Sequence, residues 1–486
     1  MLEYLNYAKS LFINGEWLEA ESGESETVCN PATLETFARV AYAGKNETER
    51  AIEAAAAAFP DWSQKTGRER SVYLYRAYQL MMEDVDRLAS LLTREQGKPL
   101  KEAKGEINSA ASFLLWYAEE ASRGYGEWLP SSVPSKRMLV IGHPIGVVGA
   151  ITPWNFPSSM ITRKVAPAIA AGCTVVLKPS PETPLSAIAI MEIFEKAGLP
   201  AGVVNMVTGD AQAIGNAMLT NKAVKMITFT GSTATGKYLM REGANQMKKV
   251  SLELGGHAPI IVFEDANLEK AATLALASKF RNNGQTCICA NRLYVHEKVA
   301  ESFTALLKEK VQQLKMGDGM QEGTDLGPLI NEQASKKVHQ QYEDAIGKGA
   351  EIVCGGLHEG HANTDLKGYY FPPTVLANAT DDMLIMHQET FGPLFPIQLF
   401  SNDDVAIQKA NNTDYGLAAY IFTENTSRTL RVAEKLEYGI VGVNDVFPAL
   451  SEAPFGGIKE SGNSKEGGHH GMDEFLEKKL VSIAVD

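Results

Sequence analysis

The chain has 486 residues, 44% of them hydrophobic and 22% charged, which is the composition of an ordinary globular protein with roughly two to four domains. Its 59 acidic and 46 basic residues give a formal net charge of −13, which argues against a nucleic acid or an anionic membrane as partner. Five cysteines are few for this length and odd in number, so a disulfide framework is not expected and a reducing compartment is indicated.

No segment of the sequence is typical of secretion or membrane insertion. The N-terminus carries Glu3 early and has no long apolar stretch, unlike a secretory signal. Residues 138–162 contain no Asp, Glu, Lys or Arg, but prolines and glycines interrupt them, so a buried strand followed by an irregular loop is the better interpretation. We therefore expect a cytoplasmic protein.

The first third of the chain is predicted to be mostly helical. The expected helices, one rich in alanine and two longer and amphipathic, cover residues 46–62, 67–95 and 100–122. Asn46 and Glu49 resemble a capping box at the start of the first helix. Residues 123–137 are rich in Ser, Pro and Gly and lead into a strand at 138–141, which indicates a connector or an assembly arm.

From residue 147 the pattern alternates between strands and helices. The expected strands cover 147–152, 173–177, 203–207 and 224–230, and the helices cover about 160–171, 184–196, 210–220 and a stretch from Ser232. Repeated βα units predict a parallel, doubly wound sheet of the nucleotide-binding kind. A second alternation runs from Pro259 to Asn444, so two α/β domains are expected to meet near Gly255 with a ligand cleft between them.

Two features of the first alternation indicate a nucleotide cofactor. The strand that ends at Thr230 runs into Gly231 and Ser232, which open a helix, and free N–H groups at that point suit a pyrophosphate. The spacing is not the GxGxxG fingerprint, so a plain strand-to-helix turn is an equal alternative. Lys178 follows another strand, where it could reach a ribose or phosphate or be a solvated surface lysine.

The residues before Cys287 follow a helical pattern that Gly284 is expected to break, which would place Cys287 on a loop. There, Arg281 and backbone N–H groups would favour the thiolate form. The alternative is a buried cysteine that behaves as a small hydrophobic residue. Cys289 is two residues further on, but two thiols alone do not complete a zinc site, so no metal is expected.

Seven motifs follow one another in order over nearly the whole chain. They are 153–157 (PWNFP), Lys178, 229–232 (FTGS), 252–256 (LELGG), 284–287 (GQTC), 389–393 (ETFGP) and 454–462 (PFGGIKESG). Each is modest alone, but together they resemble the aldehyde dehydrogenase superfamily. The resemblance implies an α/β fold with a Rossmann-type cofactor domain at 1–122 and 145–254, a catalytic domain at 255–456, and oligomerisation segments at 123–144 and 457–486.

The resemblance also implies a mechanism. Cys287 would attack the aldehyde carbon, while the Asn155 amide and the Cys287 backbone N–H hold the oxyanion. After a hydride has passed to the nicotinamide, Glu253 would act as general base for the thiol or for the water that hydrolyses the thioester. Glu466 resembles a second carboxylate that assists proton relay in many relatives. Structural alternatives remain, since Glu253 could cap a turn and Asn155 could satisfy backbone groups.

The same resemblance implies a cofactor site. Its residues would be Trp154, Lys178, Ser180, Pro181, Gly231, Ser232, Leu254, Glu389 and Phe391. Glu389 would bind the nicotinamide-side ribose, with Phe391 packed nearby. Relatives that prefer NAD often carry a glutamate where this chain has Pro181. Without that carboxylate, Ser180 and Lys178 could hold a 2′-phosphate, so we expect NADP, or use of both NADP and NAD.

Two stretches, 161–164 and 279–292, are similar to enzymes that oxidise succinate semialdehyde. Their arginines, Arg163 and Arg281, would grip the distal carboxylate of the substrate, unless either forms a structural ion pair. Many of those relatives carry a further serine in the loop before the 454–462 motif. In this chain the corresponding residues, 448–451, read PALS, and the last of them is Ser451. Ser451 could take that role, or the substrate could be glutarate semialdehyde or another short acidic aldehyde.

Further alternatives concern redox control, the acyl acceptor and the class of protein. Cys289 resembles a redox-switch partner that forms a disulfide with Cys287 in some relatives. A CoA-acylating dehydrogenase would share the fold, but Glu253 favours water as acceptor. The joint presence of Cys287, Glu253 and Asn155 argues against an idle binding protein, and a cofactor-free cysteine hydrolase would give no rise in absorbance at 340 nm. Relatives are habitually homo-oligomers, so a homodimer or homotetramer is expected.

Overall fold

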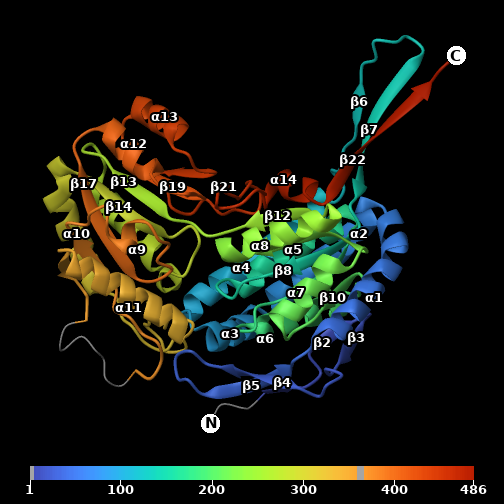
Figure 1. The fold of residues 1–486 in the computed structure, drawn as a ribbon, viewed down its shortest axis with the longest axis horizontal. Coiled ribbons are helices and arrows are strands. Elements are labelled where there is room, and N and C mark those ends of the chain that lie inside the picture. Colours follow the sequence, from blue (N-terminus) through green and yellow to red (C-terminus); the bar gives the residue numbers. More distant parts are fainter. Residues whose placement is uncertain (1–4, 358–365) are drawn as a thin grey trace.

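A computed structural model describes residues 5–357 and 366–486. Two sheets with helices around them form the two halves of the molecule, and a β-arm projects from one half (Figure 1). In strand order, the first sheet consists of β12 (Lys249–Glu253), β11 (Val224–Thr230), β8 (Val147–Ile151), β9 (Thr174–Lys178), β10 (Val204–Met206), β2 (Leu11–Ile13) and β3 (Glu16–Leu18). The strands from β12 to β10 run parallel, and β2 and β3 are antiparallel additions at the edge.

Helices cover both faces of the first sheet. One face packs against α1 (Lys45–Gln64), α7 (Ala211–Thr220) and α8 (Thr233–Gly243). The other packs against α5 (Pro157–Ala171) and α6 (Pro184–Lys196), with α2 (Gly67–Glu83), α3 (Val85–Gln96) and α4 (Leu100–Glu120) outside them. All residues of α5 and β9 are buried, because helices on both faces leave these central elements no solvent-facing side.

The second sheet is also mainly parallel. In strand order it consists of β15 (Glu351–Cys354), β16 (Thr374–Ala377), β17 (Leu394–Phe400), β14 (Ala290–His296), β13 (Ala258–Val262), β19 (Ala418–Phe422) and β20 (Ile440–Val443). One face packs against α9 (Leu268–Phe280) and α10 (Ala300–Gln312), and the other against α11 (Glu332–Gly347), α12 (Asp403–Asn411) and α13 (Thr426–Lys435). In the chain, only four residues connect β12, which belongs to the first sheet, to β13, which belongs to the second.

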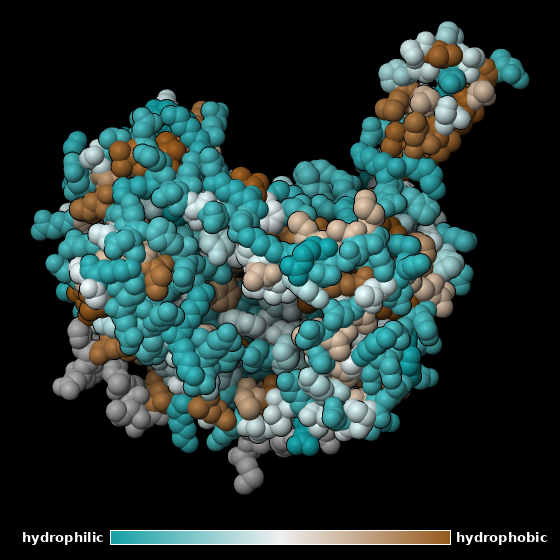
Figure 2. All heavy atoms as spheres, viewed as in Figure 1, coloured by the Kyte–Doolittle hydropathy of each residue, from teal (hydrophilic) through white to brown (hydrophobic). Residues whose placement is uncertain are grey.

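The arm is an antiparallel sheet of β6 (Glu127–Leu129), β7 (Lys136–Pro144) and the C-terminal β22 (Leu476–Ala484). Figure 2 shows hydrophobic residues gathered on the arm. Two of its large side chains are well exposed, Trp128 at 65% and Leu480 at 56%. Of the expected C-terminal assembly segment, only β22 lies in the arm. Residues 457–475 instead run along the edge of the first sheet, where Gly462 pairs with Glu253, to α14 (Gly468–Asp473) at the arm's base.

The remaining elements are short. They are a sheet of β1 (Leu5–Tyr7), β5 (Thr36–Ala41) and β4 (Ser25–Cys29), the pair β18 (Tyr415–Gly416) and β21 (Ile458–Lys459), and the 3₁₀ turns η1 (Ala244–Gln246), η2 (Arg281–Gly284), η3 (Glu297–Val299) and η4 (Leu384–Met386). No helix in the described ranges is long and apolar enough to cross a membrane.

The alternation expected from residue 147 onward is present, but three details near the N-terminus are wrong. The cap of α1 lies two residues earlier, where the Glu47 carboxylate accepts a hydrogen bond from the Gly44 N–H (3.1 Å). The helix expected at 67–95 is divided at Asp84 into α2 and α3. The strands β1 to β5 were missed, because runs of three to six residues carry little periodicity. The turn between β2 and β3 is a sequence signal that was overlooked: Asn14 and Gly15, both with positive φ, connect the two strands as a hairpin.

Candidate active site

Cys287 lies on the loop between α9 and β14. The helix ends at Phe280, earlier than expected, and η2 follows. The last three residues of η2 are left-handed, with positive φ at Asn282 (+50°), Asn283 (+54°) and Gly284 (+76°). Only glycine and, less readily, asparagine adopt this conformation at small cost. A Cβ on Gly284 would lie 2.3 Å from the Gly392 carbonyl oxygen, so both the backbone and the space require glycine there.

Buried amide side chains hold this loop in place. The Asn282 Oδ1 accepts a hydrogen bond from Gln96 (2.9 Å), and its Nδ2 donates to the Asn155 carbonyl oxygen (2.9 Å). Gln285 donates to and accepts from the backbone of residues 328–330, at 3.2 and 2.9 Å. The loop is thereby tied to the end of α3, to the segment after β8 and to the segment before α11, so parts of both halves of the molecule position the cysteine.

Two cavities meet at Cys287. One has a volume of about 630 Å³ and lies between the ends of the first sheet and α11. The other has a volume of about 280 Å³ and lies between α4, α5 and the Cys287 loop. Their linings share two residues, Cys287 and Met160. A thiol at this junction can face one ligand in each cavity.

The surroundings of Cys287 do not favour its thiolate in the way expected from the sequence. Burial of the thiol raises the pKa of Cys287 to about 12. Arg163 and, more weakly, Arg281 oppose this rise, whereas the Glu389 and Glu253 carboxylates add to it. The cationic neighbours are thus present, but desolvation outweighs them. The resting cysteine is a neutral thiol that needs a base to become a nucleophile.

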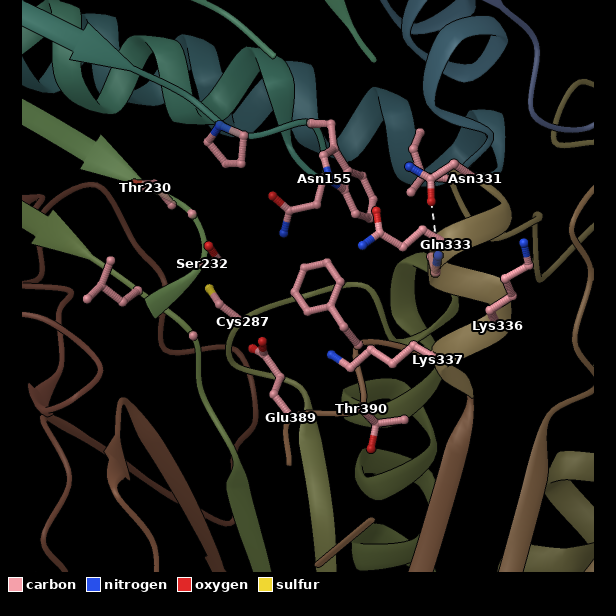
Figure 3. Close-up of a pocket in the computed structure, with 18 of the residues that line it drawn as sticks. Asn155, Thr230, Ser232, Cys287, Asn331, Gln333, Lys336, Lys337, Glu389 and Thr390 are labelled. Atoms are coloured by element: carbon pink, nitrogen blue, oxygen red, sulfur yellow. Dashed lines mark hydrogen bonds between the residues drawn. The ribbon is translucent and has the colours of Figure 1, made fainter. Parts of the chain in front are cut away.

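Asn155 is buried and lines the larger cavity close to Cys287 (Figure 3). Its backbone oxygen accepts a hydrogen bond from Lys98 (2.7 Å), whose ammonium also pairs with Glu106 at 2.6 Å. Its side-chain Nδ2 donates to the Gln285 carbonyl oxygen (3.1 Å). One amide hydrogen is therefore engaged, and the second is left for an oxygen atom held beside the thiol.

Glu253, at the end of β12, is 2% exposed and lines neither cavity. Its Oε1 accepts a hydrogen bond from the Ser464 hydroxyl (3.0 Å), and its Oε2 has no partner among the described residues. Burial raises the pKa of Glu253 well above its ordinary value, and the nearby Glu466 carboxylate raises it further. Lys164 opposes this rise, but the carboxyl keeps a high proton affinity, as a general base near neutral pH requires.

Glu466 is the second buried carboxylate of this region. Its Oε1 lies 2.5 Å from the Lys164 ammonium, and its Oε2 lies 3.7 Å from the Arg163 guanidinium. The Glu466 backbone pairs with Phe455 in both directions at 2.7 Å, which fixes the carboxylate near Glu253. The expected pair of carboxylates is therefore close together, within one buried cluster of charges.

Six of the expected cofactor residues line the larger cavity: Trp154, Gly231, Ser232, Leu254, Glu389 and Phe391. The Trp154 and Phe391 rings meet edge to face at 5.5 Å. In Figure 3 the Glu389 carboxylate and the Cys287 thiol face the same space. The Glu389 Oε1 accepts a hydrogen bond from the Gly256 N–H (2.9 Å). The backbone after β11 bends round Gly231, where a Cβ would come within 2.4 Å of the Phe229 ring.

This cavity fits a dinucleotide on three observations. Ser232 caps α8 and leaves the N-terminus of that helix at the cavity wall, a position that favours phosphate. The Thr230 hydroxyl is buried beside it without a partner in the described chain. Lys336 and Lys337 on α11 bring positive charge, and together with Gln333 and Gln340 they were missed in the sequence. Their spacing of three to four residues places them on one face of a helix, but no sequence motif indicated that this face lines the cavity.

Lys178, Ser180 and Pro181 lie outside the larger cavity. Burial lowers the pKa of Lys178 to about 8, an effect that the nearby Glu26 carboxylate opposes. The Ser180 hydroxyl accepts a hydrogen bond from the Glu182 N–H (3.3 Å), and Pro181 lines a separate cavity of about 260 Å³. At Pro181 the sequence lacks the carboxylate that NAD-preferring relatives often carry, but the fold brings Glu26 from β4 near Lys178.

Arg163 and Arg281 both line the smaller cavity with Cys287. The Arg163 guanidinium lies between two rings, 4.9 Å from Phe113 and 4.4 Å from Phe455. Arg281 makes no ion pair or side-chain hydrogen bond with any residue that the structure describes, although the Phe156 ring lies 5.4 Å away. The structural ion pair considered as an alternative is thus present for Arg163, with Glu466, but not for Arg281.

Two expected residues are not brought into these cavities. The Ser451 hydroxyl donates to Glu452 (3.1 Å), and the loop contributes Ala449 to the smaller cavity in its place. The hydroxyl residues that line the smaller cavity, Ser109, Ser159 and Thr286, were not identified from the sequence. Cys289 is buried, with its thiol directed at the Lys279 carbonyl oxygen (3.4 Å), and its pKa is raised by burial. Among the described residues, no cluster could hold a metal ion.

Comparison with known proteins agrees with this geometry. Residues 17–481 match the aldehyde dehydrogenase family. A glutarate-semialdehyde dehydrogenase from Pseudomonas putida is 50% identical over 99% of this chain and 98% of its own. The NADP-dependent succinate-semialdehyde dehydrogenase of Escherichia coli is also 50% identical, with the same two coverages.

Solved structures give the same result. A crystal structure of an NADP-dependent enzyme from Escherichia coli superposes with a TM-score of 0.96 at 50% identity, covering 98% of each chain. A match of this extent, together with a cysteine at the junction of two cavities, an asparagine beside it and a buried glutamate nearby, leaves one assignment: the chain belongs to the aldehyde dehydrogenase family.

Proposed function

We propose that this family member, an NAD(P)-dependent oxidoreductase, converts succinate semialdehyde to succinate and prefers NADP to NAD. The observation that carries the substrate is Arg281, a guanidinium on the wall of a cavity that ends at Cys287. Arg281 forms no ion pair or side-chain hydrogen bond with the described residues, although Glu102 lines the same cavity. A buried or half-buried arginine of this kind is best matched by a carboxylate that arrives with the ligand. Arg163 adds a second positive charge to the same cavity.

Glutarate semialdehyde is the second candidate substrate. Ala449 lines the cavity and Ser451 does not, so no hydroxyl from that loop limits the length of the aldehyde. The relative in Pseudomonas putida bears the name of this substrate. A CoA-acylating reaction is less well supported, because Glu253 is a buried base of high proton affinity that suits activation of water.

In the proposed acylation step, the substrate carboxylate binds Arg281 and Arg163, which places the aldehyde carbon at Cys287. The Cys287 thiol loses its proton to Glu253, directly or through water, and the sulfur attacks the carbon. The oxyanion that forms on the former aldehyde oxygen is held by the Asn155 amide and the Cys287 backbone N–H. Lys98 and Asn282 keep Asn155 in place through its backbone oxygen.

The cofactor would be held by Trp154, Ser232, Leu254 and Phe391, with Glu389 on the ribose next to the nicotinamide. Bound there, the nicotinamide supplies the hydride acceptor for oxidation of the carbon attached to Cys287. Glu253 first releases the proton of the thiol to Glu466 or to solvent; it then takes a proton from water, and the hydroxide so formed attacks the thioester carbon. The Cys287 sulfur leaves as a thiolate, the acid is released, and Glu253 returns its proton to the thiolate or passes it to Glu466.

We also propose the wider setting of the enzyme. The cofactor domain would comprise residues 1–122 and 145–254, and the catalytic domain residues 255–456. The arm, with its exposed Trp128 and Leu480, would join protomers into a homodimer or homotetramer. Residues 457–475, which run from β12 to the arm, would link assembly to the site.

Five free cysteines, two of them beside the site, suit a cytoplasmic location.

Cys289 is proposed as a redox partner of Cys287. Peroxide would oxidise the Cys287 thiolate to a sulfenic acid, and the Cys289 thiol would displace water from it to form a disulfide. Because Cys289 is buried and bonded to the Lys279 carbonyl, the loop must open for this reaction.

The thiol pKa can be measured by alkylation of the free enzyme. Because burial raises the pKa of Cys287 to about 12, inactivation by iodoacetamide should become about tenfold faster per pH unit from about pH 8 to pH 10. The same measurement on Cys289→Ala assigns the reaction to Cys287. A rate that levels off near pH 7 would contradict a neutral resting thiol.

The substrate is tested by initial rates with succinate semialdehyde, glutarate semialdehyde, acetaldehyde and benzaldehyde. Arg281→Ala should raise KM for the acidic aldehydes about 30-fold, the equivalent of about 2 kcal/mol for a charged hydrogen-bonded pair, and should leave the neutral aldehydes unchanged. Arg241→Ala, which removes an exposed arginine paired only with Glu242, serves as the matched control. Equal losses for acidic and neutral aldehydes would make Arg281 structural.

The cofactor preference is tested by comparing kcat/KM for NADP and NAD. We expect NADP to be favoured, and Lys178→Ala to reduce the NADP to NAD ratio about tenfold by removing a charge from the 2′-phosphate. Glu26→Gln should change the ratio in the opposite direction, since Glu26 lies near Lys178. A strong preference of the wild type for NAD would refute the proposal.

The redox partner is tested by peroxide inactivation followed by dithiothreitol. Wild-type activity should recover, whereas Cys289→Ala should keep its initial activity and fail to recover after the same treatment. Recovery to the same extent in both proteins would show that Cys289 takes no part.

A further inference from the structure

The Ser464 hydroxyl occupies a specific position beside the general base. Its Oγ lies 3.0 Å from Glu253 Oε1 and 3.1 Å from the Leu252 carbonyl oxygen, and the residue is 2% exposed. Within the described residues, no other group hydrogen-bonds to the Glu253 carboxyl. Neither the sequence motifs nor the proposed reaction gave Ser464 a role.

The backbone around Ser464 is fixed independently of its hydroxyl. Gly462 pairs with Glu253, and a Cβ on Gly462 would lie 2.1 Å from the Leu252 carbonyl oxygen, so the two segments are in close contact. The exposed Asn463 accepts a hydrogen bond from the Leu252 N–H (2.9 Å) and donates to the Val250 carbonyl oxygen (3.0 Å). The loop therefore presents the hydroxyl to the carboxyl as a preformed partner.

A hydroxyl has one proton to donate and can also accept. When Glu253 is ionised, Ser464 can donate its proton to Oε1. When Glu253 is protonated, the carboxyl can donate to Ser464 Oγ, and the hydroxyl proton can turn to the Leu252 carbonyl oxygen. Both protonation states are thus satisfied without movement of the Glu253 side chain. A lysine, which can only donate, could not accept from the protonated form.

The other charged groups that face Glu253 cannot substitute for this partner. Glu466 disfavours its ionised form, and Lys164 and Lys465 favour it from α5 and from the same loop as Ser464. None of the three hydrogen-bonds to Glu253: Lys164 bonds to Glu466 (2.5 Å) and Lys465 to the Gly456 carbonyl oxygen (2.6 Å). The Cys287 thiol, which accepts or supplies protons in the reaction, is the remaining titratable group.

We propose that Ser464 is a positioning residue that holds the Glu253 carboxyl in one place through its whole protonation cycle. The inference rests on the proposed function, in which Glu253 takes a proton from the water that hydrolyses the thioester. Loss of the hydroxyl removes a hydrogen bond that favours the ionised form, so the carboxyl then binds its proton more tightly.

The test isolates hydrolysis of an acyl-enzyme and needs no cofactor. An activated ester, p-nitrophenyl acetate, acylates Cys287 with a burst of nitrophenolate, and the steady rate that follows reports attack of water on the thioester. In Ser464→Ala, the midpoint of the rising limb of the steady rate against pH should move up by about one unit. Below that midpoint, the steady rate should fall about tenfold, with the burst amplitude retained.

Three further variants make the result specific. Asn463→Ala removes side-chain bonds from the same loop without touching the carboxyl, and its midpoint should equal that of the wild type. Ser464→Thr keeps a hydroxyl and should restore the wild-type midpoint. Adding Ser464→Ala to Glu253→Gln should change the steady rate less than twofold, because the hydroxyl acts through the carboxyl. Ser464→Gly repeats the deletion if Ser464→Ala does not fold.

Each outcome decides between defined alternatives. A wild-type midpoint in Ser464→Ala, or an equal loss of rate with and without Glu253, would overturn the role of Ser464. If Glu253→Gln itself hydrolyses the acyl-enzyme at the wild-type rate, the proposed general base is wrong, which is a separate failure. A shifted midpoint that Ser464→Thr restores supports the proposal, since a purely structural defect would lower the rate at every pH.

Discussion

The three left-handed residues that precede Cys287 are the constraint on which the rest of the site depends. Their backbone turns sharply at Gly284, where no side chain has room, and the cost of that turn is met by buried amide hydrogen bonds from Gln96 and Gln285. Because Asn282 also bonds to the Asn155 backbone, the nucleophile and the group that would hold the oxyanion share one support. That support draws on both sheets, so the chemistry depends on how the two halves are joined.

Burial, more than pairing of opposite charges, determines the proton affinities around this support. It raises the pKa of Cys287 against the influence of Arg163, and that of Glu253 against the influence of Lys164. Cys287 is therefore a neutral thiol at rest, and the Glu253 carboxylate, with its raised proton affinity, is suited to accept the proton of the thiol or of water during turnover. The protein as a whole carries a net charge of −13, yet the smaller cavity presents two arginines to its ligand, while its two glutamates, Glu102 and Glu106, are held by the Asn282 N–H and by Lys98. Attraction of an acidic substrate is thus a local property of the site.

How well the sequence predicted each feature depends on how far apart in the chain the interacting residues lie. The βα alternation was predictable, because strands buried on both faces, such as β9, are continuous apolar runs. The cavity residues predicted from motifs, such as Trp154 and Glu389, adjoin glycines and prolines in fixed order. Glu26 near Lys178, the face of α11 and the hydroxyl of Ser464 were not predictable, because each meets its partner only after distant segments pack together. The place of Ser451, outside the smaller cavity, was not predictable for the same reason: in a loop without repeating pattern, one hydroxyl cannot be aligned by spacing alone.

The two cavities share only Met160 and the thiol, and this separation has a kinetic meaning. Each ligand approaches the sulfur through a separate cavity, so a ligand in one cavity does not sterically block entry to the other. The acid can dissociate while the dinucleotide is still in place, and a second aldehyde can enter before the dinucleotide has exchanged. Competition for space in the two cavities therefore imposes no compulsory order of binding.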